Sequence, residues 1–156
     1  MIELEIPGEG KRLFRRLLLD YNGTLARDGK VLPGVRERLE RLAGSLELHL
    51  VTADTFGTVA AEMEGTGVEL QVLQSDDHTA EKRSLLERLG ADHTVAIGNG
   101  NNDRLMLEYS VLGIAILGPE GCAADTLRSA DLLCTSITDA LDLLLYPKRL
   151  VATLRR

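Results

Sequence analysis

Side chains with the functional groups for phosphoryl transfer follow successive apolar runs of this sequence. They are Asp20, Asn22, Thr52, Asp54, Lys82, Asn99 and Asp103. The Asp20 carboxylate can attack phosphorus and carry it as an aspartyl phosphate. A threonine hydroxyl and loop amides can hold the equatorial oxygens, a lysine can neutralise the developing charge, and oxygen ligands can bind magnesium. If one crevice holds the whole set, phosphoryl transfer is the chemistry that it predicts.

Asp20 lies at the end of an apolar run that stops abruptly in Asp-Tyr-Asn-Gly-Thr. This pattern indicates a buried strand followed by a tight polar turn, because Asn-Gly tolerates the positive φ of such turns. Gly23 and Gly100 let the backbone approach a phosphate closely. Taken alone, the segment favours an ordinary strand with an Asx turn, and it is the later loops that favour a site.

Two residue types are distributed unevenly. Asparagine occurs only in two short loops, at Asn22, Asn99, Asn101 and Asn102. Lysine is scarce, since arginine serves most basic positions, and this favours a functional Lys82 over a solvated helix residue between Glu81 and Arg83. Taken alone, Thr52 is as well explained as a helix N-cap, and Asp54 is a cap or an acid near the cleft.

The elements that must position these side chains alternate between strands and helices. The pattern predicts strands over residues 2–6, 13–20, 46–51, 68–73, 94–97, 113–117 and 132–134, the first of them an edge strand. It predicts helices over residues 35–43, 59–64, 80–89, 104–109, 123–129 and 137–145, a hairpin around Asp28-Gly29, and a terminal helix or partner-contacting tail over 147–156. This alternation predicts an α/β fold with a mostly parallel sheet and helices on both faces, whose strands present their carboxyl ends to one edge.

Length and composition bound the class of protein. The chain has 156 residues, of which 44% are apolar, and we expect a single domain over 1–156. The formal net charge of −6 gives no indication of a nucleic-acid or anionic-membrane surface. The sequence has neither the apolar region of a signal peptide nor a run long enough to span a membrane, so we expect a cytoplasmic protein.

The sequence resembles the haloacid dehalogenase (HAD) superfamily of phosphatases and P-type ATPases. The superfamily has DxDGT or DKTGT as its first motif, then a Thr or Ser after a strand, a Lys, and GDGxND. The corresponding segments here, in the same order, are Asp20-Tyr21-Asn22-Gly23-Thr24, Thr52-Ala53-Asp54, Lys82 and Gly98-Asn99-Gly100-Asn101-Asn102-Asp103. The resemblance is greatest to a small soluble branch described as P-type-ATPase-like, and it implies a three-layer Rossmann-like fold and a magnesium-dependent phosphohydrolase.

The resemblance also implies a role for each matched residue. The catalytic residues would be Asp20 as nucleophile, with Asn22, Thr52 and Lys82. The transferred phosphoryl group would be bound by Gly23, Thr24, Thr52, Ala53 and Lys82, and Mg²⁺ by Asp20, the backbone carbonyl of Asn22, Asn99 and Asp103.

Two residues depart from the superfamily pattern. Asn22 has no proton to give to a leaving group, where most of these phosphatases have an aspartate, and Asn99 replaces a carboxylate ligand. We therefore expect slow hydrolysis of small phosphorylated substrates with good leaving groups. The alternative is a catalytically weak or inactive relative that binds a phosphorylated ligand or a partner protein. A phosphoacceptor receiver domain is a third class, but Glu3, Glu5 and Glu9 do not supply its acidic pair convincingly.

The spacing of the motifs leaves no room for a cap domain. Only the hairpin over residues 27–30 is a candidate lid. We expect a site that is open, used on a bulky substrate, or covered by a second subunit of a homo-oligomer that supplies a cap in trans.

Overall fold

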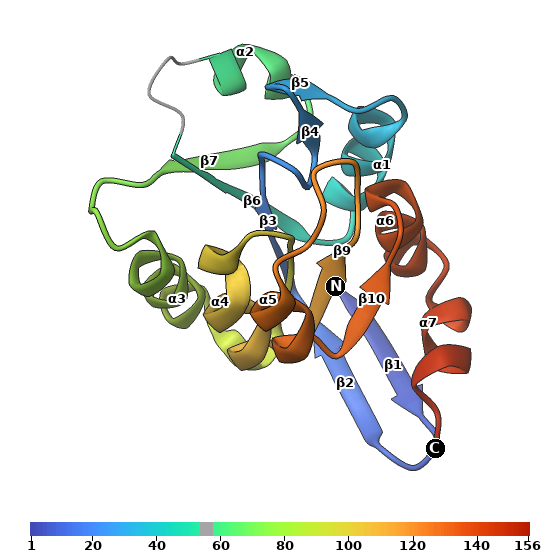
Figure 1. Ribbon diagram of the computed structural model, residues 1–156. Coiled ribbons are helices and arrows are strands. Elements are labelled where there is room, and N and C mark those ends of the chain that lie inside the picture. The colour runs from blue at the N-terminus through green and yellow to red at the C-terminus, as the bar shows by residue number, and fades with distance from the viewer. Residues whose placement is uncertain (54–57) are drawn as a thin grey trace.

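A six-stranded parallel sheet forms the centre of the computed structural model, which describes residues 1–53 and 58–156 (Figure 1). In spatial order its strands are β10 (Leu132–Cys134), β9 (Leu112–Ile116), β8 (Thr94–Gly98), β3 (Arg16–Asp20), β6 (Glu47–Thr52) and β7 (Val68–Val72). Every neighbouring pair is parallel. The predicted α/β class and the parallel sheet are confirmed.

Helices cover both faces of this sheet (Figure 1). One face carries α1 (Val35–Ala43), α2 (Thr58–Met63) and α6 (Ile137–Leu145), with α7 (Pro147–Leu154) beside α6 and the amino-terminal hairpin. The other face carries α3 (His78–Leu89), α4 (Arg104–Tyr109) and α5 (Ala124–Ser129). The 3-10 turns η1 (Ala91–His93) and η2 (Asn101–Asp103) precede β8 and α4.

Alternation along β3 explains the two-sided packing. Leu19 belongs to a buried cluster with Leu39 of α1 and Leu141 of α6, whereas Leu18 belongs to a second cluster with Leu86 of α3. Successive side chains of a strand point to opposite faces, so a continuous apolar run is buried on both sides. The position that follows this run, Asp20, is thereby brought to the carboxyl edge of the sheet.

The strand predicted over residues 13–20 is wrong, because the chain forms two strands there. β2 (Gly10–Phe14) pairs antiparallel with β1 (Ile2–Ile6) in a separate two-stranded sheet, so β1 is not an edge strand of the central sheet. The break lies at Arg15, whose N–H donates to His93 O at 2.9 Å and whose carbonyl accepts from Glu47 N at 3.0 Å. The chain thus leaves the two-stranded sheet at Arg15 and enters the central sheet. The apolar pattern alone does not reveal such a change of partner.

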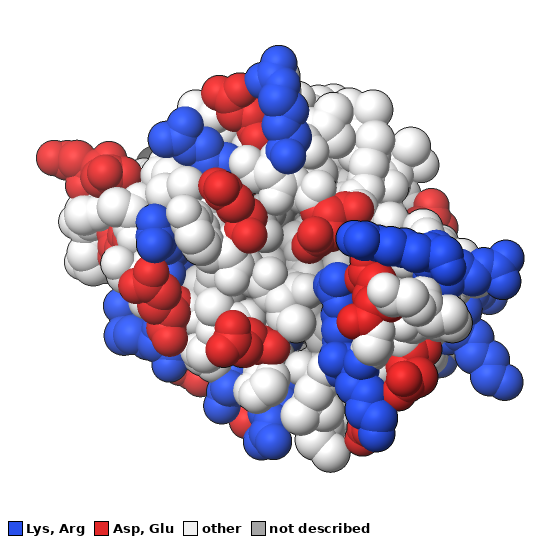
Figure 2. Space-filling model, turned by 90° about the horizontal axis from the view of Figure 1, so that it is seen from below, with Lys and Arg blue, Asp and Glu red and all other residues white. Residues whose placement is uncertain are grey.

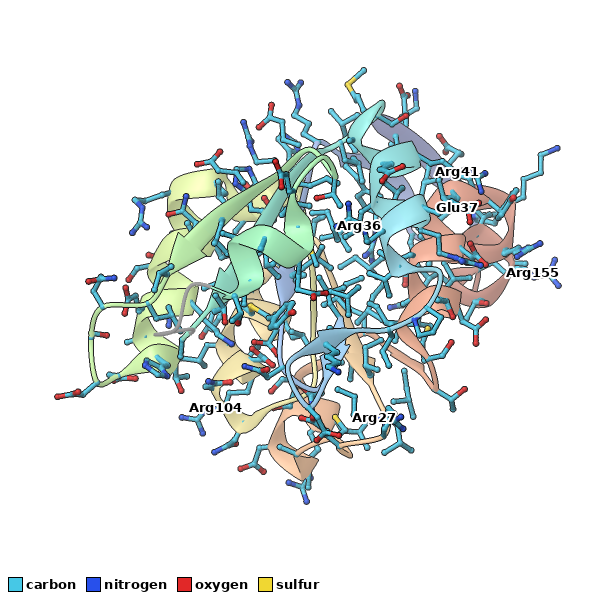
Figure 3. All side chains as sticks on the ribbon, turned by 90° about the horizontal axis from the view of Figure 1, so that it is seen from above. Arg27, Arg36, Glu37, Arg41, Arg104 and Arg155 are labelled. Carbon is cyan, nitrogen blue, oxygen red and sulfur yellow. The ribbon has the colours of Figure 1, made fainter. Side chains whose placement is uncertain are left out.

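The predicted hairpin is confirmed. β4 (Ala26–Arg27) pairs antiparallel with β5 (Lys30–Val31), and the buried Tyr21 donates its hydroxyl to Gly29 O at 3.0 Å. This bond connects the turn of the hairpin directly to the residue that follows Asp20. The hairpin and α2 both lie at the top of the molecule in Figure 1, the end from which Figure 3 is seen.

The remaining elements lie close to their predicted bounds, and the carboxyl-terminal segment is a helix, α7. None of the described helices is long and apolar enough to cross a membrane. Figure 2 shows the face opposite the carboxyl edge of the sheet, where acidic and basic side chains are interspersed. That view therefore shows no surface dominated by one sign of charge.

Candidate active site

Asp20 is the last residue of β3, at the point where the strand order reverses direction. β6 and β7 lie on one side of β3, and β8, β9 and β10 lie on the other. In open α/β sheets this switch point is where the loops diverge and leave a crevice for a ligand. Asp20 is 8% exposed, so its carboxylate is largely desolvated but still reachable.

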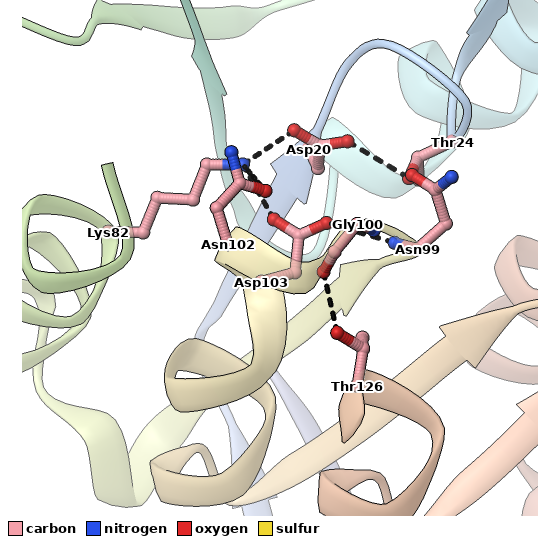
Figure 4. Close-up of polar contacts among 8 residues, drawn as sticks. All are labelled: Asp20, Thr24, Lys82, Asn99, Gly100, Asn102, Asp103 and Thr126. Atoms are coloured by element: carbon pink, nitrogen blue, oxygen red, sulfur yellow. Dashed lines mark hydrogen bonds and ion pairs between the residues drawn. The ribbon is translucent and has the colours of Figure 1, made fainter. Parts of the chain in front are cut away.

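Lys82 lies between two carboxylates (Figure 4). Its Nζ is 2.7 Å from Asp20 Oδ1 and 2.6 Å from Asp103 Oδ1, and the side chain is 1% exposed. Lys82 comes from α3 and Asp103 from η2, so three separate elements meet at this ammonium group. The interpretation of Lys82 as a solvated helix residue is wrong.

Burial and the close charges together set the ionisation of this triad. Burial raises the pKa of Asp20 to about 7, and repulsion from Asp103 acts in the same direction, against the attraction of Lys82. Burial opposes the charge of Lys82, but the two carboxylates outweigh it and raise the pKa of the lysine. Lys82 is therefore a permanent cation beside the candidate nucleophile.

Thr24 connects Asp20 to the asparagine-rich loop. Its hydroxyl lies 3.2 Å from Asp20 Oδ2 and 3.1 Å from Asn99 Oδ1, and it can donate to either oxygen. The side chain of Asn99 also packs on the backbone of Gly23, where an added Cβ would lie 2.4 Å from Asn99 Nδ2. Gly23 has φ 78, so a glycine satisfies both the turn and the close approach.

The structure gives a reason for the amide at position 99. Asn99 Nδ2 donates to Gly121 O at 3.1 Å while Oδ1 accepts from Thr24. An aspartate in the same orientation would place a carboxylate oxygen against the Gly121 carbonyl, with no hydrogen to share. The departure from the superfamily pattern thus matches the local hydrogen bonding.

Backbone N–H groups of the same loop hold Asp103. Its Oδ2 accepts from Asn99 N and Gly100 N, both at 2.9 Å, and the residue is fully buried. Gly98 makes room for this carboxylate, since a Cβ there would lie 2.5 Å from Asp103 Cγ. With Oδ1 on Lys82, both carboxylate oxygens have partners.

The other predicted residues lie at or just after the carboxyl ends of β3 and β6. Asn22 is exposed, and Thr52 is 2% exposed as the last residue of β6, the strand paired with β3. Ala53 is exposed next to it, and Asp54 lies outside the described residues. The structure thus brings together Asp20, Thr24, Lys82, Asn99 and Asp103 by direct contacts.

Two residues near the site had no predicted role. Asn102 Oδ1 lies 3.4 Å from Lys82 Nζ, and Thr126 of α5 donates its hydroxyl to Gly100 O at 2.6 Å (Figure 4). Asn102 was visible as part of the asparagine-rich motif. Nothing in the local sequence around Thr126 signals its position, because α5 reaches this loop only in the folded chain.

The side chains at the site offer oxygen donors of the kind that Mg²⁺ prefers. They are the carboxylates of Asp20 and Asp103 and the amide oxygen of Asn99. Among the described residues, no three His, Cys, Asp or Glu side chains gather as metal ligands. The donor set fits a hard divalent cation that takes few protein ligands and completes its shell with water and phosphate oxygens.

Comparison with known proteins gives a family and a fold. No protein-family model matches the chain. It is 46% identical over 78 residues to the uncharacterized protein MJ0073 of Methanocaldococcus jannaschii, an alignment that covers 47% of this chain and 84% of that protein. The chain belongs to the family of this archaeal protein. A second protein of that organism, MJ0072, is 51% identical over 39 residues, which cover 25% of this chain and 89% of MJ0072.

Solved structures identify the fold. A 3-deoxy-D-manno-octulosonate 8-phosphate phosphatase of Moraxella catarrhalis, in complex with magnesium, phosphate and KDO, superposes with a TM-score of 0.67 at 20% identity, covering 91% of this chain and 94% of that chain. The cobalt-bound phosphatase for the same class of substrate from Haemophilus influenzae gives 0.71 at 13% identity, covering 85% and 88%. A Legionella pneumophila structure described as a HAD superfamily (subfamily III A) hydrolase gives 0.67 at 19%, covering 89% and 86%. The chain has the haloacid dehalogenase fold, as its motifs predicted.

Proposed function

We propose that this chain is a magnesium-dependent phosphohydrolase of HAD type that acts through an aspartyl phosphate on Asp20. The observation that carries the proposal is the buried contact between Asp20 and Lys82, at 2.7 Å, at the switch point of the sheet. A carboxylate held there beside a permanent cation has the position and the charge balance of a phosphoryl acceptor.

In the first step an oxygen of the Asp20 carboxylate forms a bond to phosphorus while the bond from phosphorus to the leaving-group oxygen breaks. The leaving group departs with the electron pair of that bond. Lys82, the Thr52 hydroxyl and the backbone amides around Gly23 and Ala53 would hold the equatorial oxygens. Preorganised donors of this kind stabilise the charge of the transition state without having to reorient.

In the second step water attacks the same phosphorus and the bond to Asp20 breaks. Inorganic phosphate leaves, the carboxylate is regenerated, and the proton of the water passes to phosphate or solvent. Asn22 has no titrating group, so it cannot protonate the first leaving group or activate the water. The proposal therefore favours acyl, aryl and anhydride phosphates, whose leaving groups are stable as anions.

Asp20, Asn99, Asp103 and the Asn22 carbonyl would hold Mg²⁺, directly or through water. The ion, when bound, neutralises phosphoryl charge and orients the phosphate for in-line attack. Metal use of this kind is consistent with the magnesium- and cobalt-bound structures of the same fold.

The substrate class would be a small phosphorylated molecule. Two of the solved structures reported above are phosphatases whose names give such a substrate, an octulosonate 8-phosphate. We expect residues 1–156 to form a single catalytic core without a cap domain. The hairpin β4–β5, or a second subunit of a homo-oligomer, would then cover the site when substrate binds.

We place the chain in the P-type-ATPase-like branch as part of this proposal, because it has both neutral substitutions, Asn22 and Asn99.

A binding protein without turnover is the second candidate. Two neutral amides at the site, Asn22 and Asn99, favour it. They weaken proton transfer and the attraction of a metal ion, while Lys82 still contacts Asp20 and Asp103. Turnover of phosphate esters would then stay at background, yet phosphate with magnesium would raise the melting temperature by binding the folded state.

Hydrolysis of p-nitrophenyl phosphate and acetyl phosphate with Mg²⁺ tests the proposal. We expect Asp20→Asn to reduce turnover to background, and Asp76→Asn, an exposed aspartate outside the site, to retain wild-type activity. Turnover that survives in Asp20→Asn would refute the mechanism. Background turnover in the wild-type protein, combined with stabilisation by phosphate and magnesium, would favour the binding protein.

A further inference from the structure

We propose that Thr126 is a positioning residue for the active site, an inference that rests on the proposed function. Thr126 lies in α5, outside the matched motifs, and is fully buried. Its hydroxyl donates to the backbone carbonyl of Gly100 at 2.6 Å (Figure 4). A helix on the far side of the asparagine-rich loop therefore holds the backbone of that loop directly.

The bonded carbonyl belongs to the residue that shapes the loop. Gly100 O also accepts from Asp103 N at 2.9 Å, and Gly100 N donates to Asp103 Oδ2 at 2.9 Å. Gly100 and Asp103 thus form a closed ring of two hydrogen bonds, and the Thr126 hydroxyl restrains one side of it. Moving this carbonyl would rotate the peptide groups that orient the Asp103 carboxylate.

Lys82 connects Asp103 to the candidate nucleophile, Asp20. Its Oδ1 lies 2.6 Å from Lys82 Nζ, and the same ammonium group lies 2.7 Å from Asp20 Oδ1. A continuous series of contacts therefore joins the Thr126 hydroxyl to the Asp20 carboxylate. Thr126 does not touch the reacting atoms, so its effect would come from where it holds the others.

The segment that leads into α5 holds the preceding residue of the loop in the same way. Ala123 N donates to Asn99 O at 2.9 Å, and Gly121 O accepts from Asn99 Nδ2 at 3.1 Å. Residues 121–126 thus hold both the backbone and the side chain of the loop that carries Asn99 and Asp103. Gly121 and Ala123 make these contacts through their backbone, and Thr126 through its side chain, so a conservative substitution of Thr126 removes its contact without changing the backbone.

Thr126→Val and Thr126→Ser, with Thr94→Val as the matched control, separate positioning from stability. Thr94 is also fully buried and donates its hydroxyl to a backbone carbonyl, Gly90 O at 2.8 Å, but it lies at the amino-terminal start of β8. Both valine variants lose one buried hydrogen bond of the same kind. We expect both to lower the melting temperature by a similar amount.

The two valine variants should differ at the active site. We expect Thr126→Val to lower kcat, or raise the Mg²⁺ concentration for half-maximal rate, by about 10- to 100-fold, as supporting residues around metal sites do. Thr94→Val should retain the wild-type values, and Thr126→Ser, which keeps the hydroxyl, should restore them. Equal effects of the two valine variants on kcat and Mg²⁺ dependence would overturn the proposal.

Amide hydrogen exchange at Asn99 and Gly100 gives a readout that needs no turnover. Both amides donate to Asp103 Oδ2, so we expect faster exchange of both in Thr126→Val than in Thr94→Val. Unchanged exchange would overturn the positioning role. A wild-type protein without Asp20-dependent hydrolysis would refute the proposed function instead, and the exchange measurement would still decide whether Thr126 holds the loop.

Discussion

Replacing Lys82 with methionine would leave two buried carboxylates without the ammonium group between them. Asp20 and Asp103 each lie within 2.7 Å of Lys82 Nζ, and Asp103 is fully buried. Methionine retains most of the apolar stem, so the substitution removes the charge with little change in packing. The expected loss of stability is therefore mainly electrostatic.

Removing one partner of a buried ion pair costs about 3–5 kcal/mol, because the remaining charge is desolvated and uncompensated. In a domain of this size each kcal/mol lowers the melting temperature by about 2–4 °C, so Lys82→Met should lower it by about 6–20 °C. The exposed Lys148→Met is the matched control, and a surface change of this kind costs about 0.5 kcal/mol at most.

Urea denaturation of Lys82→Met, Asp20→Asn and the double variant measures the coupling. We expect the loss caused by Lys82→Met to be smaller in the Asp20→Asn background by about 0.5–3 kcal/mol, since only Asp103 then remains uncompensated. A loss below about 1 kcal/mol for Lys82→Met, or an equal loss in both backgrounds, would refute the view that Lys82 balances two buried charges.

Two further predictions concern local geometry and pH. Gly23 and Gly29 have similar φ values, 78 and 77, but only at Gly23 would the Cβ of an alanine lie 2.4 Å from Asn99 Nδ2. Urea denaturation should therefore show a larger loss of folding stability for Gly23→Ala than for Gly29→Ala. Equal losses of stability would contradict the contact. Burial lowers the pKa of His49 from 6.5, although Glu69 Oε2 lies 3.6 Å from His49 Nδ1 and acts in the opposite direction. The folded state therefore binds fewer protons than the unfolded state, and folding stability should fall as the pH drops below about 6.5. His49→Leu should reduce this fall, as measured by denaturation at about pH 7.5 and about pH 5.5, and an unchanged fall would show that other groups cause it.

Local pattern was sufficient for most elements. The helices α1, α4 and α6 and the strand β10 have the bounds predicted from periodicity, because each is amphipathic or apolar over a length bounded by turn residues. The error at Arg15 shows the limit of local pattern. An apolar run with a polar interruption is compatible with one strand or two, and pairing with His93 and Glu47 decides between them.

The sequence by itself determined which residue types are available at the carboxyl edge of the sheet. The order of the motifs, the asparagine-rich loop and the position of Asp20 after an apolar run are all properties of the chain, and they predicted the fold and the kind of site. Tertiary structure alone decided how these groups meet. Lys82 is buried between two carboxylates, and Thr126 reaches the backbone of Gly100, because separate helices pack on the same face of the sheet. Contacts of this kind depend on the distance between elements that are remote in the chain, which local periodicity does not encode.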